Sequence, residues 1–240
     1  MPTSEKSFVI VDAGNTSIKV AQVKNSQIQS VKRYDHISDA VSSISDTVVV
    51  CASVLNEDFK QLVIKNGGRF HQITHQSTLP FKSAYSSMET IGIDRLCNAA
   101  AAAKTFGSEH CLIVDIGTCV KFDFISAKKV YLGGSISPGI NLRYKALHEH
   151  TSKLPLIDIK GNAPIIGDST NSSIYSGVMN GIMYEIQGVI LRYQKDFGQL
   201  KILITGGDAS YFDFPQKSNI FANKNLTLEG IVEIYEINAL

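Results

Sequence analysis

The sequence lacks any marked excess of charge of one sign. Its 240 residues include 23 lysines and arginines against 22 aspartates and glutamates, a formal net charge of +1 at pH 7. A protein that binds nucleic acid or an anionic membrane through bulk charge needs a basic surplus. The sequence therefore predicts no nucleic-acid partner and no membrane partner, although a small basic face within this neutral total is not excluded.

Long apolar runs are also missing. No stretch approaches the ~18 consecutive apolar residues that a membrane helix requires. The opening residues, MPTSEKSFVIVDAG, hold no apolar segment long enough for a signal peptide before the chain becomes acidic. With 44% hydrophobic and 19% charged residues, the composition is typical of a globular protein. We therefore expect a soluble, cytoplasmic protein.

Cysteine is sparse and is not spaced for metal or disulfide chemistry. The four cysteines are Cys51, Cys97, Cys111 and Cys119, and no two of them follow the CxxC spacing of zinc and redox sites. Three of them lie in apolar runs with a strand-like or helix-like pattern. This arrangement predicts reduced, buried thiols.

Apolar segments of strand length alternate with helical patterns along the chain, which predicts an α/β fold. Strands are expected at residues 8–11, 17–23, 48–54, 111–114, 119–125 and 201–204, and helices at residues 56–66, 96–106, 140–150 and 171–196. A further apolar run is expected to end at Gly133 and Gly134. The segment 152–166, which holds two prolines, is expected to be a loop.

One unit of sequence occurs twice, at residues 8–23 and again at residues 111–125. Each copy has an apolar strand, a turn of the form Asp-x-Gly-(Asn)-Thr, and a second β-rich run. This repeat predicts a duplication with one domain at residues 1–110 and another at residues 111–240. Because no low-complexity linker separates the copies, we expect the domains to pack around a shared cleft.

The first turn, DAGNT at residues 12–16, carries groups suited to phosphate. Gly14 permits close approach of the backbone to an anion, and Asn15 and Thr16 add side-chain donors. Asp12 at the strand end can hold Mg²⁺ through water, and Lys19 is either a phosphate ligand or a solvated hairpin residue. Since Asp, Gly and Asn favour turns in any protein, this turn alone does not distinguish a phosphate site from a plain hairpin.

A second turn of the same kind, DIGT at residues 115–118, indicates a phosphate-binding site formed by two such turns. A third glycine turn, TGGD at residues 205–208, also follows a strand and suits a nucleoside. The sequence has no GxxxxGK[ST] motif and no GxGxxG after a strand, which argues against a P-loop or a Rossmann site.

Together these motifs resemble the type III pantothenate kinases, within the superfamily of acetate and sugar kinases, heat-shock ATPases and actin. The resemblance covers nearly the whole chain and rests on seven motifs in the family's order. They are DAGNTSIK (12–19), GIDR (92–95), DIGTCVKFD (115–123), GGSISPG (133–139), TxxLP (151–155), GDST (167–170) and TGGDA (205–209). The resemblance implies two duplicated ribonuclease-H-like, actin-like ATPase domains with a nucleotide cleft between them.

The resemblance also implies an activity, cofactors and site residues. The activity is ATP-dependent phosphorylation of pantothenate to 4'-phosphopantothenate, the first step of coenzyme A synthesis, in a homodimer that uses Mg²⁺ and a monovalent cation. Asp94 is the implied general base, and Asp115 the implied ligand of K⁺ or NH₄⁺. The implied pantothenate contacts are Tyr85, Gly92, Ile93, Asp94, Arg95 and, reaching in from the other subunit, Thr170. The implied ATP contacts are Asp12, Ala13, Gly14, Asn15, Thr16, Ser17, Ile18, Lys19 and Thr118.

Purely structural explanations exist for several of these residues. Asp94 could cap the alanine-rich helix that follows it, with Arg95 in solvent. Tyr85 could be ordinary half-buried aromatic surface, and Thr170 could be a helix N-cap. For the whole chain the alternatives are a non-catalytic, nucleotide-binding transcriptional accessory factor of the same family, or another small-molecule kinase of the superfamily.

Three positions depart from the family pattern. Met88 stands where the family usually has proline, which loosens the loop that carries Tyr85. Cys119 and Lys121 stand where the family commonly has small or hydroxyl residues. Because Lys121 shares a strand face with Cys119 and Asp123, its ammonium could approach the cation site and alter the monovalent-cation requirement. The alternative is that Lys121 pairs with Asp123 or faces solvent.

Overall fold

The structure is a computed structural model that describes residues 7–13, 18–42, 44, 47–52, 57–215 and 218–239. The chain divides into two compact units. The first comprises Met1–Gly107 together with Asn225–Leu240, and the second comprises Ser108–Lys224. The C-terminal residues, which the sequence analysis assigned to the second domain, thus belong to the first unit.

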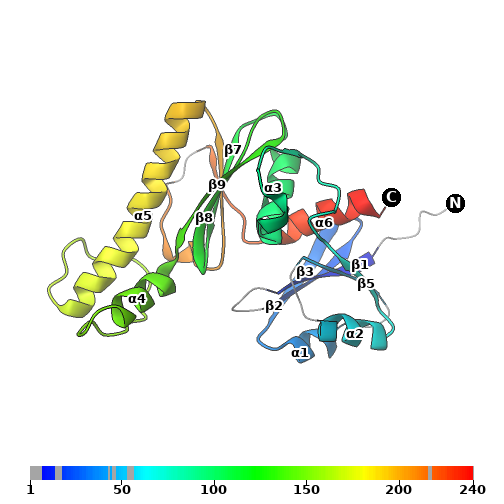
Figure 1. Cartoon of the computed structure of the whole chain (residues 1–240), viewed down its shortest axis with the longest axis horizontal. Coiled ribbons are helices and arrows are strands. Elements are labelled where there is room, and N and C mark those ends of the chain that lie inside the picture. The colour runs from blue at the N-terminus through cyan, green and yellow to red at the C-terminus, as the bar shows by residue number, and fades with distance from the viewer. Residues whose placement is uncertain are drawn as a thin grey trace. The chain divides into compact units, whose positions relative to one another are not determined.

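The first unit contains a five-stranded sheet with the order β3-β2-β1-β4-β5 (Figure 1). Its elements are β1 (Ser7–Ala13), β2 (Ile18–Lys24), β3 (Gln27–Tyr34), α1 (Ile37–Ser42), β4 (Val48–Cys51), α2 (Glu57–Lys65), β5 (Arg69–Gln72), β6 (Lys82–Ser83), a 3₁₀ turn (Met88–Thr90), α3 (Ile93–Thr105) and α6 (Leu226–Asn238). Fully buried Val11, Val49 and Phe59 join the sheet to its helices. A run of alanines with high helix propensity favours helix α3, and these residues, 99–103, are buried.

The strands of the second unit lie in the order β11-β10-β7-β8-β9. Its elements are β7 (Cys111–Ile116), β8 (Cys119–Ile125), β9 (Val130–Pro138), α4 (Ile140–Glu149), α5 (Thr170–Phe197), β10 (Lys201–Thr205), a 3₁₀ turn (Ala209–Tyr211) and β11 (Ile220–Ala222). The long helix α5 runs beside this sheet (Figure 1), and Ile182 and Ile186 bury completely in the core that also contains Phe122 and Tyr144.

The two sheets have the same topology. In the first, β1 pairs antiparallel with β2, β2 antiparallel with β3, β1 parallel with β4, and β4 parallel with β5. In the second, β7, β8 and β9 repeat the antiparallel part, and β10 and β11 repeat the parallel part. The α/β class and the duplication predicted from the repeated turn are confirmed.

Strand β9 differs from the expectation that an apolar run ends at the two glycines. It continues through Gly133 and Gly134 to Pro138, paired with β8 along its length. A Cβ on Gly134 would lie 1.6 Å from the carbonyl oxygen of Phe122, so glycine here permits close strand contact and does not stop the strand. The extension carries the chain to the corner at Pro138, next to the second predicted phosphate turn.

The cysteines follow the predicted pattern for the most part. Cys51, Cys97 and Cys111 are buried and Cys119 is half-buried, and all four are free thiols. Burial raises the pKa of the Cys111 thiol to about 12, with the Glu109 carboxylate adding to the effect, so this thiol stays protonated near neutral pH. Among the described residues, no helix is both long enough and apolar enough to span a membrane.

Candidate functional site

Two of the predicted turns meet at the end of β7 in the second unit. The amide N–H of Asp208 donates to the carbonyl of Ile116 at 2.9 Å. Gly206 has φ +100°, and a Cβ there would lie 2.1 Å from the same carbonyl oxygen. Only glycine combines this left-handed backbone with such a close approach. The turn at residues 205–208 is therefore fixed directly against the turn at residues 115–118.

A third glycine corner closes on the same turn. The amide of Gly139 donates to the carbonyl of Thr118 at 3.0 Å, and a Cβ on Gly139 would lie 2.1 Å from the carbonyl oxygen of Gly117. Thr118 itself is exposed, so its hydroxyl is available to a ligand. Three turns that are far apart in sequence thus share one sheet end, and clustered turns of this kind suit phosphate groups.

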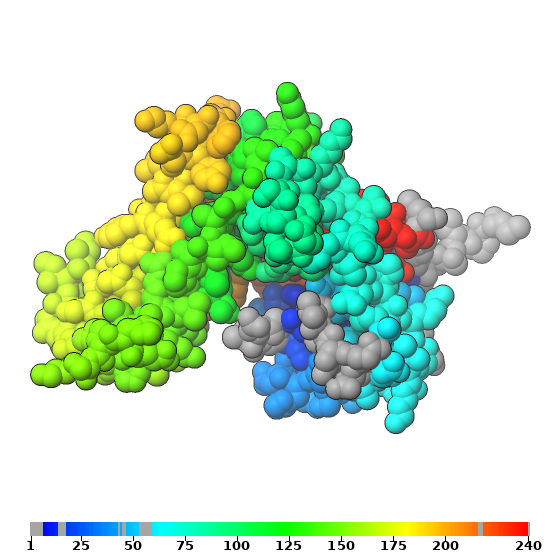
Figure 2. All heavy atoms as spheres, in the orientation of Figure 1, coloured from blue at the N-terminus to red at the C-terminus, as the bar shows by residue number. Residues whose placement is uncertain are grey.

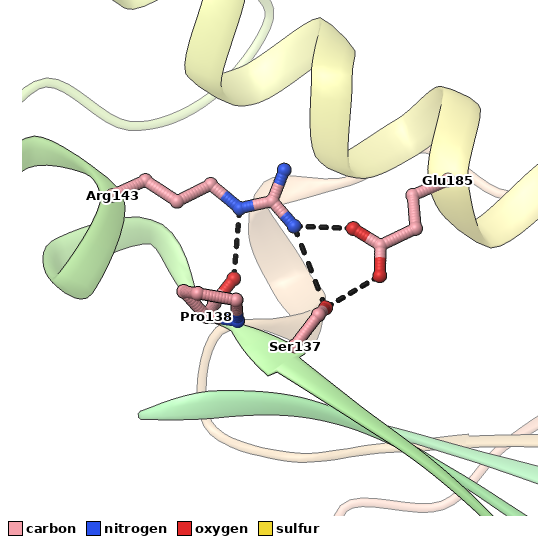
Figure 3. Close-up of polar contacts among 4 residues, drawn as sticks. All are labelled: Ser137, Pro138, Arg143 and Glu185. Carbon is pink, nitrogen blue, oxygen red and sulfur yellow. Dashed lines mark hydrogen bonds and ion pairs between the residues drawn. The ribbon is translucent and has the colours of Figure 1, made fainter.

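A polar cluster holds the corner at Pro138 in place (Figure 3). Arg143 of α4 donates from Nε to the Pro138 carbonyl at 2.8 Å and from Nη2 to Ser137 Oγ at 3.5 Å. The same Nη2 forms an ion pair with Glu185 of α5, and Ser137 Oγ donates to the other carboxylate oxygen of Glu185 at 2.5 Å. Two helices therefore position the corner that contacts Thr118.

The role of this polar cluster in positioning the corner at Pro138 can be tested with Arg143→Met. The change removes the guanidinium from the Pro138 carbonyl and leaves the half-buried Glu185 carboxylate without this partner, at a cost of about 1–3 kcal/mol in the free energy of unfolding. We expect ATP affinity, measured by titration calorimetry, to fall by roughly 10-fold because the corner at Pro138 is held less firmly. This fall corresponds to about 1.4 kcal/mol of binding free energy.

Arg192→Met is the matched control for that variant. Arg192 pairs with Asp196 one turn away on α5, and its side chain is 74% exposed, so its loss should change neither ATP affinity nor stability appreciably. Equal effects of the two substitutions on ATP affinity would show that the Arg143 cluster has no special role at the turn.

Asp115 lies in this site and has a cationic partner. It is 9% exposed, and the Nζ of Lys121 lies 2.8 Å from its Oδ2. The two residues face each other across the β7–β8 ladder. The expected approach of Lys121 to the predicted cation ligand is confirmed. Asp123, the alternative partner, is buried and accepts a 2.5 Å hydrogen bond from the Tyr131 hydroxyl.

In the first unit, the strands that flank the first phosphate turn form a regular hairpin. Asp12 and Ala13 end β1, and they pair with Lys19 and Ile18 of β2. Asp12 and Lys19 therefore stand directly opposite each other at the mouth of the turn. The predicted ATP contacts Gly14, Asn15, Thr16 and Ser17 lie outside the described residues.

The GIDR motif forms the start of α3. Gly92 is the N-cap, with no side-chain capping bond, and a Cβ on it would lie 2.4 Å from Oδ1 of Asp94. Arg95 is only 5% exposed, and its Cζ lies 5.8 Å from the centroid of the half-buried Tyr85 ring, within cation–π range. The expectation of a solvated Arg95 is wrong. Gly92 is the N-cap residue, and the half-buried Ile93 and Asp94 lie in the first turn that follows it.

Two predicted acidic residues of the first unit influence one thiol. Burial raises the pKa of Cys97 well above its ordinary value, and the charges of Asp12 and then Asp94 raise it further. A carboxylate must be near a group to shift its pKa in this way. The predicted magnesium ligand and the predicted base therefore lie in the same part of the first unit, and Cys97 stays protonated and unreactive.

Thr170 is the first residue of α5 and is exposed. The N-cap is Ser169, whose side chain accepts from the amide of Ser172 in a reciprocal capping box, so Thr170 is not the cap. Thr170 instead lines a groove of about 650 Å³ together with Leu147, Leu154 and Ile174. Its hydroxyl is thus available for a contact outside its own helix.

Sequence reasoning missed Lys160 beside the third turn. Its Nζ lies 3.9 Å from Asp208 Oδ1 and 5.2 Å from the ring centroid of Tyr211. Burial raises the pKa of the Asp208 carboxyl, and Lys160 partly opposes this rise. None of Lys160, Arg143 and Glu185 belongs to a sequence motif. Lys160 lies in a loop and the other two lie on helices, so only the tertiary fold brings these three side chains close to the turns.

Comparisons with known proteins agree on one family. A model of the type III pantothenate kinase family matches residues 8–192. A type III pantothenate kinase from Christiangramia forsetii is 37% identical over 239 residues, covering 96% of this chain and 98% of the relative.

Two solved structures also resemble the chain. One, described as a Baf family transcriptional activator from Campylobacter jejuni, has a TM-score of 0.62 at 25% identity and covers 97% of this chain and 99% of its own. The other, described as an N-acetylmannosamine kinase from Listeria monocytogenes, has a TM-score of 0.54 and covers 98% and 100%. At 13% identity, this second likeness shows a shared fold alone.

Proposed function

Because the chain belongs to the type III pantothenate kinase family, we propose that it transfers the γ-phosphoryl group of ATP to the primary hydroxyl of pantothenate. The product is 4'-phosphopantothenate, a precursor of coenzyme A. The observation that carries this proposal is the family match over residues 8–192, which includes both phosphate turns and the GIDR motif. The resemblance drawn from the sequence motifs is confirmed by that match.

Asp94 is the general base in this proposal, accepting the proton of the attacking hydroxyl. Its half-buried carboxylate lies in the first turn of α3, and phosphoryl transfer asks for positioning of the nucleophile more than for strong acid–base chemistry. The buried guanidinium of Arg95, which lies 5.8 Å from the Tyr85 ring centroid, binds the carboxylate of pantothenate, a task that its planar fork suits. Gly92 and Ile93 complete this surface.

In this proposal each unit carries a glycine turn that binds phosphate. Thr118 and the backbone around it hold phosphate in the second unit, and residues 12–19 do so in the first. Mg²⁺ neutralises the phosphate charge when bound. A nucleotide metal needs one or two carboxylates plus phosphates, and the half-buried Asp12 at a strand end fits that requirement. Among the described residues, no cluster of three or more histidines, cysteines or acids offers a metal site independent of ATP.

The proposed enzyme is a cytoplasmic homodimer whose pantothenate site lies near the interface. Atoms of α4 and α5, coloured from yellow-green to yellow, form part of the face of the second unit that Figure 2 shows. Beside the start of α5, Ile165 and Ile166 are 80% and 84% exposed, and adjacent exposed apolar residues mark interaction surfaces. Thr170 lies four residues after Ile166, so a partner chain on this surface receives its hydroxyl.

A monovalent cation at Asp115 does not fit the chain as it stands. The resemblance places K⁺ or NH₄⁺ at that carboxylate, but the ammonium of Lys121 already lies 2.8 Å from its Oδ2. A second positive charge bound there would be repelled at close range in a partly buried setting. The proposed reaction therefore includes no step through such an ion.

An acceptor panel tests the proposal. Release of ADP from Mg²⁺-ATP is measured with pantothenate, with N-acetylmannosamine, with glucose and with no acceptor. Release that depends on pantothenate supports the proposal. Release with a sugar alone would identify another kinase of the superfamily, and ATP binding without release in any arm would favour the regulatory alternative suggested by the Campylobacter jejuni structure.

A further inference from the structure

We propose that the side chain of Lys121 supplies the positive charge that the family resemblance assigns to a monovalent cation at Asp115. The chain would then use ATP without K⁺ or NH₄⁺. This inference rests on the proposed function for the identity of the reaction, but the charge it concerns belongs to the second phosphate turn alone.

The geometry of the pair is the first argument. Asp115 and Lys121 are direct cross-strand partners, so the backbone ladder itself brings their side chains to the same place. Nζ lies 2.8 Å from Oδ2, and the two side chains are only 18% and 13% exposed. A pair held by a ladder and shielded from water is ordered, unlike a surface ion pair that opens into solvent.

The position of the pair relative to the turn is the second argument. Asp115 directly precedes Ile116, whose carbonyl accepts a hydrogen bond from the Asp208 amide. Asp115 is also the partner of Thr205 in the parallel pairing of β7 with β10. An uncompensated carboxylate at this point would repel the phosphates that Thr118 is proposed to bind. Some positive charge is therefore needed at Asp115, and Lys121 is there to provide it.

The chemistry of the ammonium group is the third argument. The Lys121 head group is in effect an ammonium ion tethered to the chain, with three N–H donors for oxygen ligands. It carries the same charge as K⁺ or NH₄⁺ and prefers the same carboxylate and carbonyl oxygens. Because it is covalently attached, it needs no ion from solution and loses no translational freedom on binding.

The first experiment varies the cation with the native protein. ATP affinity by calorimetry and ADP release with pantothenate are measured in choline chloride and in KCl at equal ionic strength and saturating Mg²⁺. Because choline is too large for a site between two strands, only KCl can supply an ion. We expect both quantities to be the same in the two salts.

The second experiment uses Lys121→Thr and Lys121→Gln, with Lys128→Thr as the matched control. Lys128 is an exposed lysine of the same unit outside the proposed site. In choline, both Lys121 variants should bind ATP about 10-fold more weakly than the native protein, and KCl or NH₄Cl should restore most of that loss. The control should show no dependence on the salt. Thermal unfolding in each salt identifies a variant that fails to fold.

The outcomes separate this inference from the proposed function. Two results would overturn the role of Lys121, whatever the acceptor is. One is that the native protein requires K⁺ to bind ATP. The other is that the native protein binds ²⁰⁵Tl⁺ and that Lys121→Thr leaves this binding unchanged. Cation-independent ATP binding without turnover of pantothenate leaves the role of Lys121 intact and counts against the acceptor. A salt response that appears only in the Lys121 variants supports the inference.

Discussion

Asp94→Asn is expected to lower the rate of pantothenate phosphorylation by roughly 10²- to 10⁴-fold, the usual contribution of a positioned general base. The amide keeps the size and most of the packing of the carboxylate in the first turn of α3, but it cannot accept the proton of the attacking hydroxyl. ATP affinity should change little, because the glycine turns supply its proposed contacts. Steady-state kinetics and calorimetry on the same preparation measure the two quantities.

Asp39→Asn is the matched control for the base. Asp39 also lies in the first turn of a helix of the first unit, α1, so the substitution removes the same favourable interaction with the helix dipole. It should leave turnover unchanged. If Asp94→Asn retains native turnover, or loses ATP binding in parallel with turnover, Asp94 is not the base.

Gly206→Ala is expected to disrupt the turn at residues 205–208 of the second unit, which is proposed to bind nucleotide. At φ +100° and with 2.1 Å between a new Cβ and the Ile116 carbonyl oxygen, the methyl group cannot be accommodated without moving the turn at residues 205–208. The unfavourable backbone conformation alone costs about 1–3 kcal/mol, and the displaced turn loses the hydrogen bond from Asp208. We expect ATP affinity to fall by at least about 10-fold, with a lower free energy of unfolding in urea.

The adjacent glycine provides the control for that substitution. A Cβ on Gly207 meets nothing within 4 Å, so Gly207→Ala tests a methyl group one residue away without the clash. It should fold like the native protein. If both alanine variants bind ATP with native affinity, the contact between Gly206 and Ile116 does not position the site.

The fold could be predicted from sequence wherever a pattern is local and one face is buried. Strands β7 and β8 are buried through most of their length, and the helix predicted at residues 171–196 agrees with α5 to within one residue at each end. Strands β3 and β5 were missed because they lie at the edges of the first sheet, where exposed polar side chains hide the alternation that marks a strand. The assignment of α6 to the first unit required its packing against α3, which no local pattern reports.

The candidate site was predictable to a different degree. Asp94, Asp115 and Thr118 lie in compact motifs that carry the family resemblance, so the sequence alone singled them out, and their roles remain predictions. Arg143 and Glu185 are far apart in the chain and lie on separate helices, so their link to Pro138 appears only when α4 and α5 pack together. Motifs identify the residues that face a ligand, whereas the groups that position them depend on tertiary structure.

Phosphorylation of pantothenate is the reaction on which the proposed roles of these residues depend. The most direct test is to incubate the native protein with Mg²⁺, pantothenate and ATP labelled at its γ-phosphate, and then to identify the labelled product by mass spectrometry. We expect the label to appear on pantothenate as a monophosphate ester, in the same molar amount as the ADP formed. Unlabelled pantothenate in the presence of bound ATP, or ADP formed with the label released as free phosphate, would contradict it.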